Sequence, residues 1–186
     1  MSESATASAG YLATIRDIDK FTEYTGYLFA LITAPLILAN TYEVVSRYVF
    51  NEPTEWALDV TTQSFAALFM LGAPYALLKG AHVRTDMLWE KFTDRNKGLI
   101  DAIAFIILFL PTMAVLFYIS IDDFMYSWGI NERSNTTSWQ PIIWPLRAVI
   151  PLSCALMFIQ GISETLKSLH AARTGQFLVH HEKIEV

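Results

Sequence analysis

The sequence is poor in the residues that most catalytic and cofactor sites require. A single cysteine, Cys154, excludes an internal disulfide and any cysteine-based metal site. The four histidines lie outside the long apolar segments, whereas a membrane bundle that carries haem needs histidines facing each other inside its helices. These histidines are His82, His170, His180 and His181. We therefore expect no catalytic site, no bound metal and no cofactor.

Charged residues are scarce as well. Only 17% of the 186 residues are charged and 53% are hydrophobic, and the mean hydropathy is +0.35. Soluble domains carry about 25% charged residues on average, so this composition favours a membrane protein. The formal charge is −5 and the sequence contains no Lys/Arg cluster, which argues against a nucleic-acid partner.

Four apolar segments reach or approach the length of a membrane span. A hydrocarbon layer of about 30 Å takes about 20 helical residues to cross, and the four segments cover approximately residues 24–46, 56–78, 99–121 and 144–166. The joints between them are short and leave no room for a soluble domain. We predict an all-α fold, an integral membrane four-helix bundle over residues 11–170.

The flanking and joining segments are polar or amphipathic. Residues 1–10 are small and polar, so we predict a disordered N-terminus, and they lack the basic start and apolar core of a signal peptide. Apolar residues at helical spacing predict short in-plane amphipathic helices near residues 11–23 and 83–93. Residues 171–186 are predicted to form a tail.

Basic residues are distributed unevenly between the two sides of this bundle. Ten of the 13 Lys and Arg residues precede the first span, lie between the second and third spans, or follow the fourth. The other three are Arg47, Arg133 and Arg147. By the positive-inside rule, both termini, the middle loop and the tail are cytoplasmic, and the two hairpin loops face the opposite compartment.

The stretch between the first two spans carries charges that must lie near a membrane boundary. Glu43 and Arg47 are four residues apart and therefore share one face of a helix. Asn51-Glu52-Pro53 is expected to end that helix, and Trp56 suits a headgroup layer. Asp59 then returns within reach of Arg47. Two interpretations stay open: a polar cap at the membrane surface, or a charge cluster that fixes the hairpin against a partner.

The spans lack the features of a self-sufficient transporter. Ionisable residues inside a membrane normally mark substrate or ion pathways, but here they cluster at the ends of the spans. Small residues such as Gly72 and Gly161 fit contacts between helices. The spans look like packing surfaces, which leaves three alternatives: a transporter subunit without a transport site, a stand-alone membrane scaffold or assembly protein, or a membrane anchor of a redox complex.

Four stretches give the sequence a family resemblance. They are Ser46 to Asn51 followed by Pro53 and Trp56; Gly72-Ala73 with Lys79 to Asp86; Trp144 to Pro151; and Gln160-Gly161. With these stretches the chain resembles the small membrane subunit of the tripartite ATP-independent periplasmic (TRAP) transporters, the DctQ-like family. The span count and the inferred orientation agree with this resemblance over the whole chain.

The resemblance implies a division of labour among three proteins. A soluble periplasmic binding protein captures an organic acid, commonly a carboxylate, and a large membrane subunit carries the substrate and sodium sites and moves like an elevator. The small subunit docks on the static part of the large subunit, in the bacterial inner membrane and among its lipids, with both termini inside. No substrate or sodium site of the family maps onto this chain, and direct contact with the binding protein stays open.

The candidate residues for the partner interface or for the local structure come from these motifs. They are Glu43, Arg47, Asn51, Pro53, Trp56, Asp59, His82, Arg84, Asp86, Trp144 and Arg147. None is predicted to bind substrate or metal or to take part in catalysis.

Overall fold

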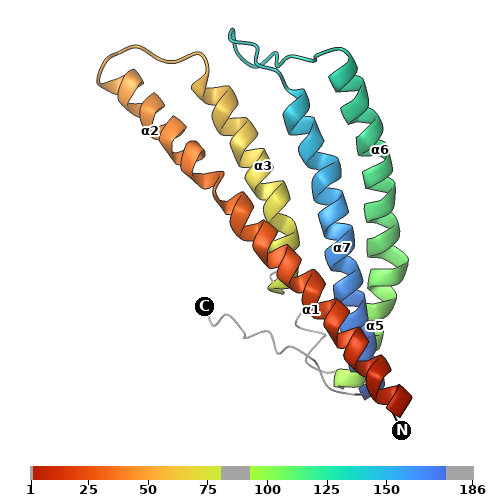
Figure 1. Ribbon diagram of the computed structural model, residues 1–186. Helices are drawn as coiled ribbons and strands as arrows, with labels where there is room; N and C mark the ends of the chain where they lie inside the picture. The colour runs from red at the N-terminus through yellow and green to blue at the C-terminus, as the bar shows by residue number, and fades with distance from the viewer. Residues whose placement is uncertain (1, 81–92, 175–186) are drawn as a thin grey trace.

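The computed structural model describes residues 2–80 and 93–174, which form long helices joined by two loops (Figure 1). The helices are α1 (Ser2–Ala30), α2 (Thr33–Tyr48), α3 (Ala57–Leu78), α5 (Asp94–Ala104), α6 (Leu110–Gly129) and α7 (Trp144–Thr174). A π-helical turn, Phe105–Phe109, joins α5 to α6. The predicted all-α fold is confirmed for these residues.

Helices α1 and α2 follow one another along one tilted path and are separated by a short turn (Figure 1). The break lies at Leu31 and Ile32, about one turn before Pro35. A proline cannot donate a hydrogen bond to the carbonyl four residues earlier, and its ring clashes with that carbonyl. Pro35 therefore explains why the helix is interrupted at Leu31.

Three helical segments of the described residues are long and apolar enough to cross a membrane: Gly10–Tyr48, Arg95–Gly129 and Trp144–Thr174. Three of the four predicted spans are thereby supported by length and composition. The second predicted span is the helix α3, which is not among the three. Its first turns are polar, since residues 61–64 read Thr-Thr-Gln-Ser.

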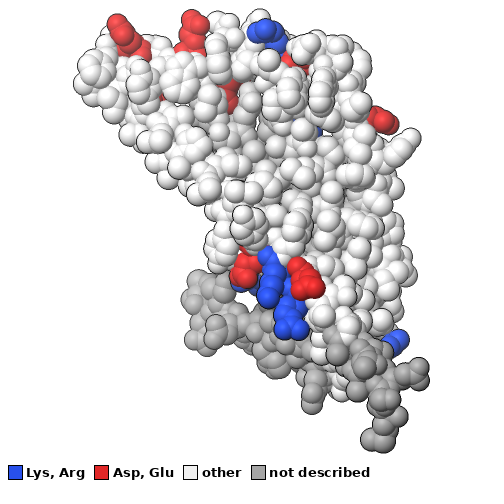
Figure 2. Space-filling model, in the orientation of Figure 1, with Lys and Arg blue, Asp and Glu red and all other residues white. Residues whose placement is uncertain are grey.

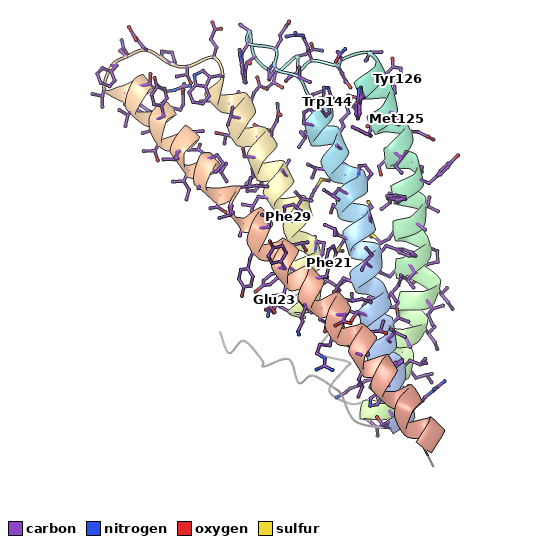
Figure 3. The ribbon with its side chains drawn as sticks, viewed as in Figure 1. Phe21, Glu23, Phe29, Met125, Tyr126 and Trp144 are labelled. Atoms are coloured by element: carbon purple, nitrogen blue, oxygen red, sulfur yellow. The ribbon has the colours of Figure 1, made fainter. Side chains whose placement is uncertain are left out.

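Helix α7 is the centre of the fold. It packs against α1, α3, α5 and α6, whereas α2 packs mainly on α3 (Figure 1). In α7, 39% of the most apolar 18-residue stretch is buried, compared with 6% of the corresponding stretch in each of the other two candidate spans. Large apolar side chains such as Phe21 on α1 and Tyr126 on α6 remain exposed on the outside (Figure 3).

A polar contact in the middle of the bundle follows from a proline in α3. Pro74 cannot donate to the carbonyl of Met70, which would leave that carbonyl without its helical partner. The hydroxyl of Ser153 on α7 donates to it instead, at 2.6 Å. A hydrogen bond between the helices thus replaces one that is lost within α3.

Gly161 allows close packing at the next crossing of α7, as the sequence predicted. A Cβ atom at this position would lie 2.6 Å from Cε1 of Phe109, in the π-helical turn. Only a residue without a side chain fits against that ring.

Two of the predicted flanking features differ from the structure or lie outside it. Residues 11–23 form no separate helix, because α1 runs without a break to Ala30, and its Asp19 and Thr22 contact α7. The position of this segment in the plane of a membrane stays a prediction. The helix predicted near residues 83–93 lies almost wholly outside the described residues. Helix α1 begins at Ser2, within the segment for which the sequence predicts disorder, and that disorder stays a prediction.

Candidate functional site

Charged side chains gather at the two ends of the bundle, and a band without charges separates them (Figure 2). We refer to the end with loops 49–56 and 130–143 as the loop end, and to the end with Asp19, Lys79 and Lys167 as the basal end. The predicted position of ionisable residues at the ends of the spans is confirmed for the part of the chain that the structure describes.

At the loop end, Glu43 joins helix α2 to the loop that follows it. Its Oε1 accepts a hydrogen bond from Nε of Arg47 at 2.9 Å, and its Oε2 accepts one from the backbone N–H of Thr54 at 3.0 Å. The hydroxyl of Thr54 donates to the same oxygen. The side chain of Glu43 is 16% exposed and that of Arg47 is 54% exposed. The predicted pairing of Glu43 with Arg47 on one helix face is confirmed.

The loop itself begins where Asn51-Glu52-Pro53 predicted. Helix α2 ends at Tyr48, and Asn51 has a φ angle of 60°, in the left-handed region that asparagine tolerates better than most residues. Trp56 comes directly before α3, and its ring centroid is 5.6 Å from that of Tyr42. These contacts hold α2 and α3 together at the loop end.

Asp59 has a different partner from the one the sequence suggested. It is 2% exposed, and its carboxylate accepts hydrogen bonds from the hydroxyl of Ser134 at 2.9 Å and from that of Thr137. Arg47 pairs instead with Glu43, the carboxylate four residues away on its own helix. The expected approach of Asp59 to Arg47 is therefore wrong, and Asp59 joins α3 to loop 130–143.

Replacing Asp59 with alanine is expected to free loop 130–143. The change removes a buried carboxylate and leaves the hydroxyls of Ser134 and Thr137 without their acceptor, which typically costs about 1–3 kcal/mol. Amide hydrogen exchange should speed up in this loop while the helices stay protected. The control is Glu55→Ala, which removes an exposed carboxylate of the other loop. Equal exchange in both variants would contradict the role of Asp59.

Trp144 and Arg147 join the start of α7 to the end of α6. The ring of Trp144 stacks on that of Trp128, with centroids 5.2 Å apart and an interplanar angle of 19°. Arg147 forms ion pairs with Asp123 on α6 and, at 2.7 Å, with Glu132 in the loop. Both residues were predicted as interface or structural residues. The structure gives them contacts within the chain.

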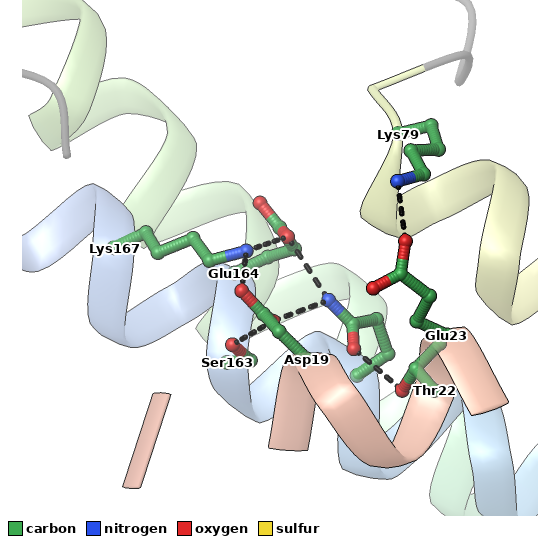
Figure 4. A network of polar contacts seen from close by, with 8 residues as sticks. Asp19, Thr22, Glu23, Lys79, Ser163, Glu164 and Lys167 are labelled. Atoms are coloured by element: carbon green, nitrogen blue, oxygen red, sulfur yellow. Dashed lines mark hydrogen bonds and ion pairs between the residues drawn. The ribbon is translucent and has the colours of Figure 1, made fainter. Parts of the chain in front are cut away.

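At the basal end, a buried polar cluster joins α1 to α7 (Figure 4). Gln160 is fully buried and lies at its centre. Its Oε1 accepts from the hydroxyl of Thr22 at 2.7 Å, and its Nε2 donates to Asp19 at 3.2 Å and to Glu164 at 3.1 Å. The amide therefore links three side chains from two helices.

Lys167 supplies the positive charge of this cluster. Its Nζ lies 2.8 Å from a carboxylate oxygen of Asp19 and 2.8 Å from one of Glu164. The hydroxyl of Ser163 donates to the other oxygen of Asp19 at 2.7 Å. One ammonium group thus lies between two carboxylates. The other hydrogen bonds to these carboxylates come from the neutral side chains of Gln160 and Ser163.

None of the residues of this cluster was among the predicted candidates, although Gln160 belongs to one of the four stretches that carry the family resemblance. A signal was present, because the polar residues of α7 recur at intervals of three and four and so share one helix face. They are Gln160, Ser163, Glu164 and Lys167. Asp19 and Thr22 are three residues apart on α1 and therefore share one face of that helix.

A second ion pair at the basal end joins α1 to α3. Nζ of Lys79 lies 2.9 Å from Oε1 of Glu23, and 5.3 Å from the centroid of the Tyr75 ring. The hydrogen bond to Glu23 raises the pKa of Lys79 above its usual value. This stabilising effect is therefore present at neutral pH and is lost only as the pH rises through the raised pKa. His82, Arg84 and Asp86, which follow in the sequence, lie outside the described residues.

The arrangement of these groups suits the joining of helices better than chemistry. Within residues 2–80 and 93–174, no group of three or more His, Cys, Asp or Glu side chains is placed to hold a metal ion. Each polar cluster joins elements of this chain at one end of the bundle, and the band between the ends shows no charged side chains (Figure 2).

Comparison with known proteins adds independent information. The sequence profile described as "Tripartite ATP-independent periplasmic transporters, DctQ component" matches residues 36–171, which is most of the chain. A curated relative from Vibrio cholerae serotype O1, the C4-dicarboxylate TRAP transporter small permease protein DctQ, is 31% identical over 62 residues. That match covers 33% of this chain and 27% of the length of the relative. No solved structure matches the chain.

Proposed function

Because the chain belongs to the DctQ family of tripartite ATP-independent periplasmic transporters, we propose that it braces the static part of a larger transport subunit. Members of this family are small permease components without catalytic activity, so the chain is a membrane protein and not an enzyme. The other components of the transporter are its expected partners.

The proposed transporter takes up an organic acid, with a carboxylate as the expected substrate class, and uses a sodium or other ion gradient. The large membrane subunit moves the substrate, and a soluble periplasmic protein delivers it. The chain lies in the bacterial inner membrane, crosses it four times including α3, and keeps both termini in the cytoplasm. The uneven distribution of basic residues supports this orientation.

One observation carries the bracing role: the ion pairs described above lie at the two ends, and residues between the ends are uncharged. The segments 24–42 of α1 and α2, 60–78 of α3, 110–121 of α6 and 148–163 of α7 contain no Asp, Glu, Lys or Arg. A transport pathway normally needs ionisable groups at that depth. A bundle fixed at both ends and apolar outside is suited to widen the static part of a neighbour in the bilayer.

Co-expression with the large subunit of the proposed transporter tests this function. The two proteins should purify together, and uptake of the organic acid should require both. The isolated chain in liposomes should not accumulate the solute. Accumulation driven by the chain alone, or full uptake in its absence, would overturn the proposal.

Arg47→Ala is expected to reduce co-purification with the large subunit several-fold more than Arg133→Ala. The first change removes the ion pair of Glu43, whose carboxylate also holds loop 49–56 through Thr54. The second removes only a hydrogen bond from Arg133 to the carbonyl of Gln140 at 3.2 Å. The ratio of the two subunits after affinity purification measures the effect. Equal ratios for both variants would show that the Glu43 pair has no part in assembly.

A further inference from the structure

We propose that the loop end of the chain binds a phospholipid, with the phosphate against Arg133 and an acyl chain in a groove between α2 and α3. The inference does not depend on the proposed function, because it concerns two cavities of this chain alone.

The first cavity is an apolar groove of about 630 Å³. It is lined by Pro35, Leu38, Ala39, Thr41, Tyr42, Val45, Trp56 and Val60. On α2 the lining runs from Pro35 to Val45, which at 1.5 Å per residue is about 15 Å along the helix. A hydrocarbon layer is about 30 Å thick. The groove therefore has the length of one acyl chain within a single leaflet.

The second cavity, of about 420 Å³, adjoins the first, and its lining mixes polar and apolar side chains. Val60 lines both cavities, so they adjoin at this residue of α3. Gln63, Arg133 and Trp139 supply an amide, a guanidinium and an indole to the second cavity. Tryptophan is enriched at the headgroup level of membranes. Trp139 therefore suggests that this cavity lies where a headgroup would lie.

Arg133 differs from the other two arginines of the loop end in its charge balance. Arg47 is paired with Glu43, and Arg147 is paired with Asp123 and Glu132. In the part of the chain that the structure describes, Arg133 has no carboxylate partner and donates to the backbone carbonyl of Gln140. A guanidinium matches the geometry of a phosphate through paired hydrogen bonds.

An amphiphile satisfies both cavities at once. A wholly apolar helix of a partner protein would fill the apolar groove but would leave the charge of Arg133 uncompensated. A free anion would compensate this charge but would leave the apolar groove open. A phospholipid brings a phosphate and an acyl chain in one molecule, and the two cavities are neighbours because Val60 lines both.

Native mass spectrometry of the full chain in detergent, titrated with palmitoyl-oleoyl phosphatidylglycerol, tests the inference. Arg133→Gln should lower the affinity about tenfold, the loss expected for a hydrogen bond to a charged group. Diacylglycerol with the same acyl chains should bind wild type and Arg133→Gln equally. Val45→Trp, which fills the groove, should weaken binding of both lipids. The control Arg16→Gln, which removes an exposed positive charge of α1 at the basal end, should bind phosphatidylglycerol like the wild type.

Three results would overturn the inference. They are unchanged phosphatidylglycerol affinity in Arg133→Gln, displacement of the lipid by millimolar inorganic phosphate, and capture of the large subunit in place of lipid by a photo-crosslinker at Val45 in the assembled transporter. Loss of co-purification with the large subunit, in contrast, would count against the proposed function and leave lipid binding intact.

Discussion

Replacing Lys167 with methionine is expected to destabilise the folded chain by about 3–5 kcal/mol, the usual cost of removing one partner of a buried ion pair. The side chain of Lys167 is 9% exposed and lies between the carboxylates of Asp19 and Glu164. Without the ammonium group, two negative charges would face each other across the contact of α1 with α7. We expect α1 to detach from α7 first, because this cluster supplies most of their polar contacts.

Thermal unfolding in detergent, followed by circular dichroism, measures this effect. Lys79→Met is the matched control, because its ion pair with Glu23 is exposed and exposed pairs contribute little. Adding Glu164→Gln and Asp19→Asn to Lys167→Met should recover much of the lost stability, since both unpaired charges are then removed. A single variant as stable as the control would show that the cluster does not hold α1 in place.

Gly98→Ala is expected to destabilise the chain by about 1–3 kcal/mol, as overpacking typically does. A Cβ atom on Gly98 would lie 2.6 Å from the backbone nitrogen of Ala172 and 2.8 Å from the backbone oxygen of Ser168. Neither atom can rotate away, so α5 and α7 would have to separate. The higher helix propensity of alanine, worth about 1 kcal/mol, offsets only part of this cost.

Gly72→Ala provides the comparison within the same chain. It lies inside α3, and a Cβ atom there would meet nothing within 4 Å. We therefore expect unchanged or slightly increased stability, through helix propensity alone. The midpoint temperatures of the two variants should move in opposite directions. A midpoint for Gly98→Ala at or above that of Gly72→Ala would contradict the close contact of α5 with α7.

The helices and the ends of loop 49–56 followed from local features of the sequence. Asn51-Glu52-Pro53 ends α2 because its backbone preferences act within a few residues, and Glu43 meets Arg47 because a helix fixes that spacing. Features that act over long distances along the chain were harder to predict. Asp59 meets hydroxyls about 75 residues away, and periodicity gives no information about the relative rotation of two helices.

The same reason explains the cluster around Gln160. Its members on α7 share a face that the sequence reveals, but the identity of the facing helix depends on packing. Residues 11–23 were predicted to form a short in-plane helix, and no partner was predicted for Asp19. In the structure, Asp19 forms a largely buried ion pair with Lys167, which lies 148 positions further along the chain.

The interruption between α1 and α2 has a mechanical consequence. The backbone N–H groups of Leu31, Ile32 and Ala34 donate to carbonyls three residues earlier, at 3.3, 3.0 and 3.1 Å. The regular α-helical hydrogen bonds to the fourth preceding residue are therefore interrupted at this point. Before this turn, Asp19 and Thr22 bind α1 to α7. After it, α2 packs mainly against α3. The joint therefore lacks the hydrogen bonds that stiffen a continuous helix, and the direction of α2 is set by its packing on α3 and not by α1.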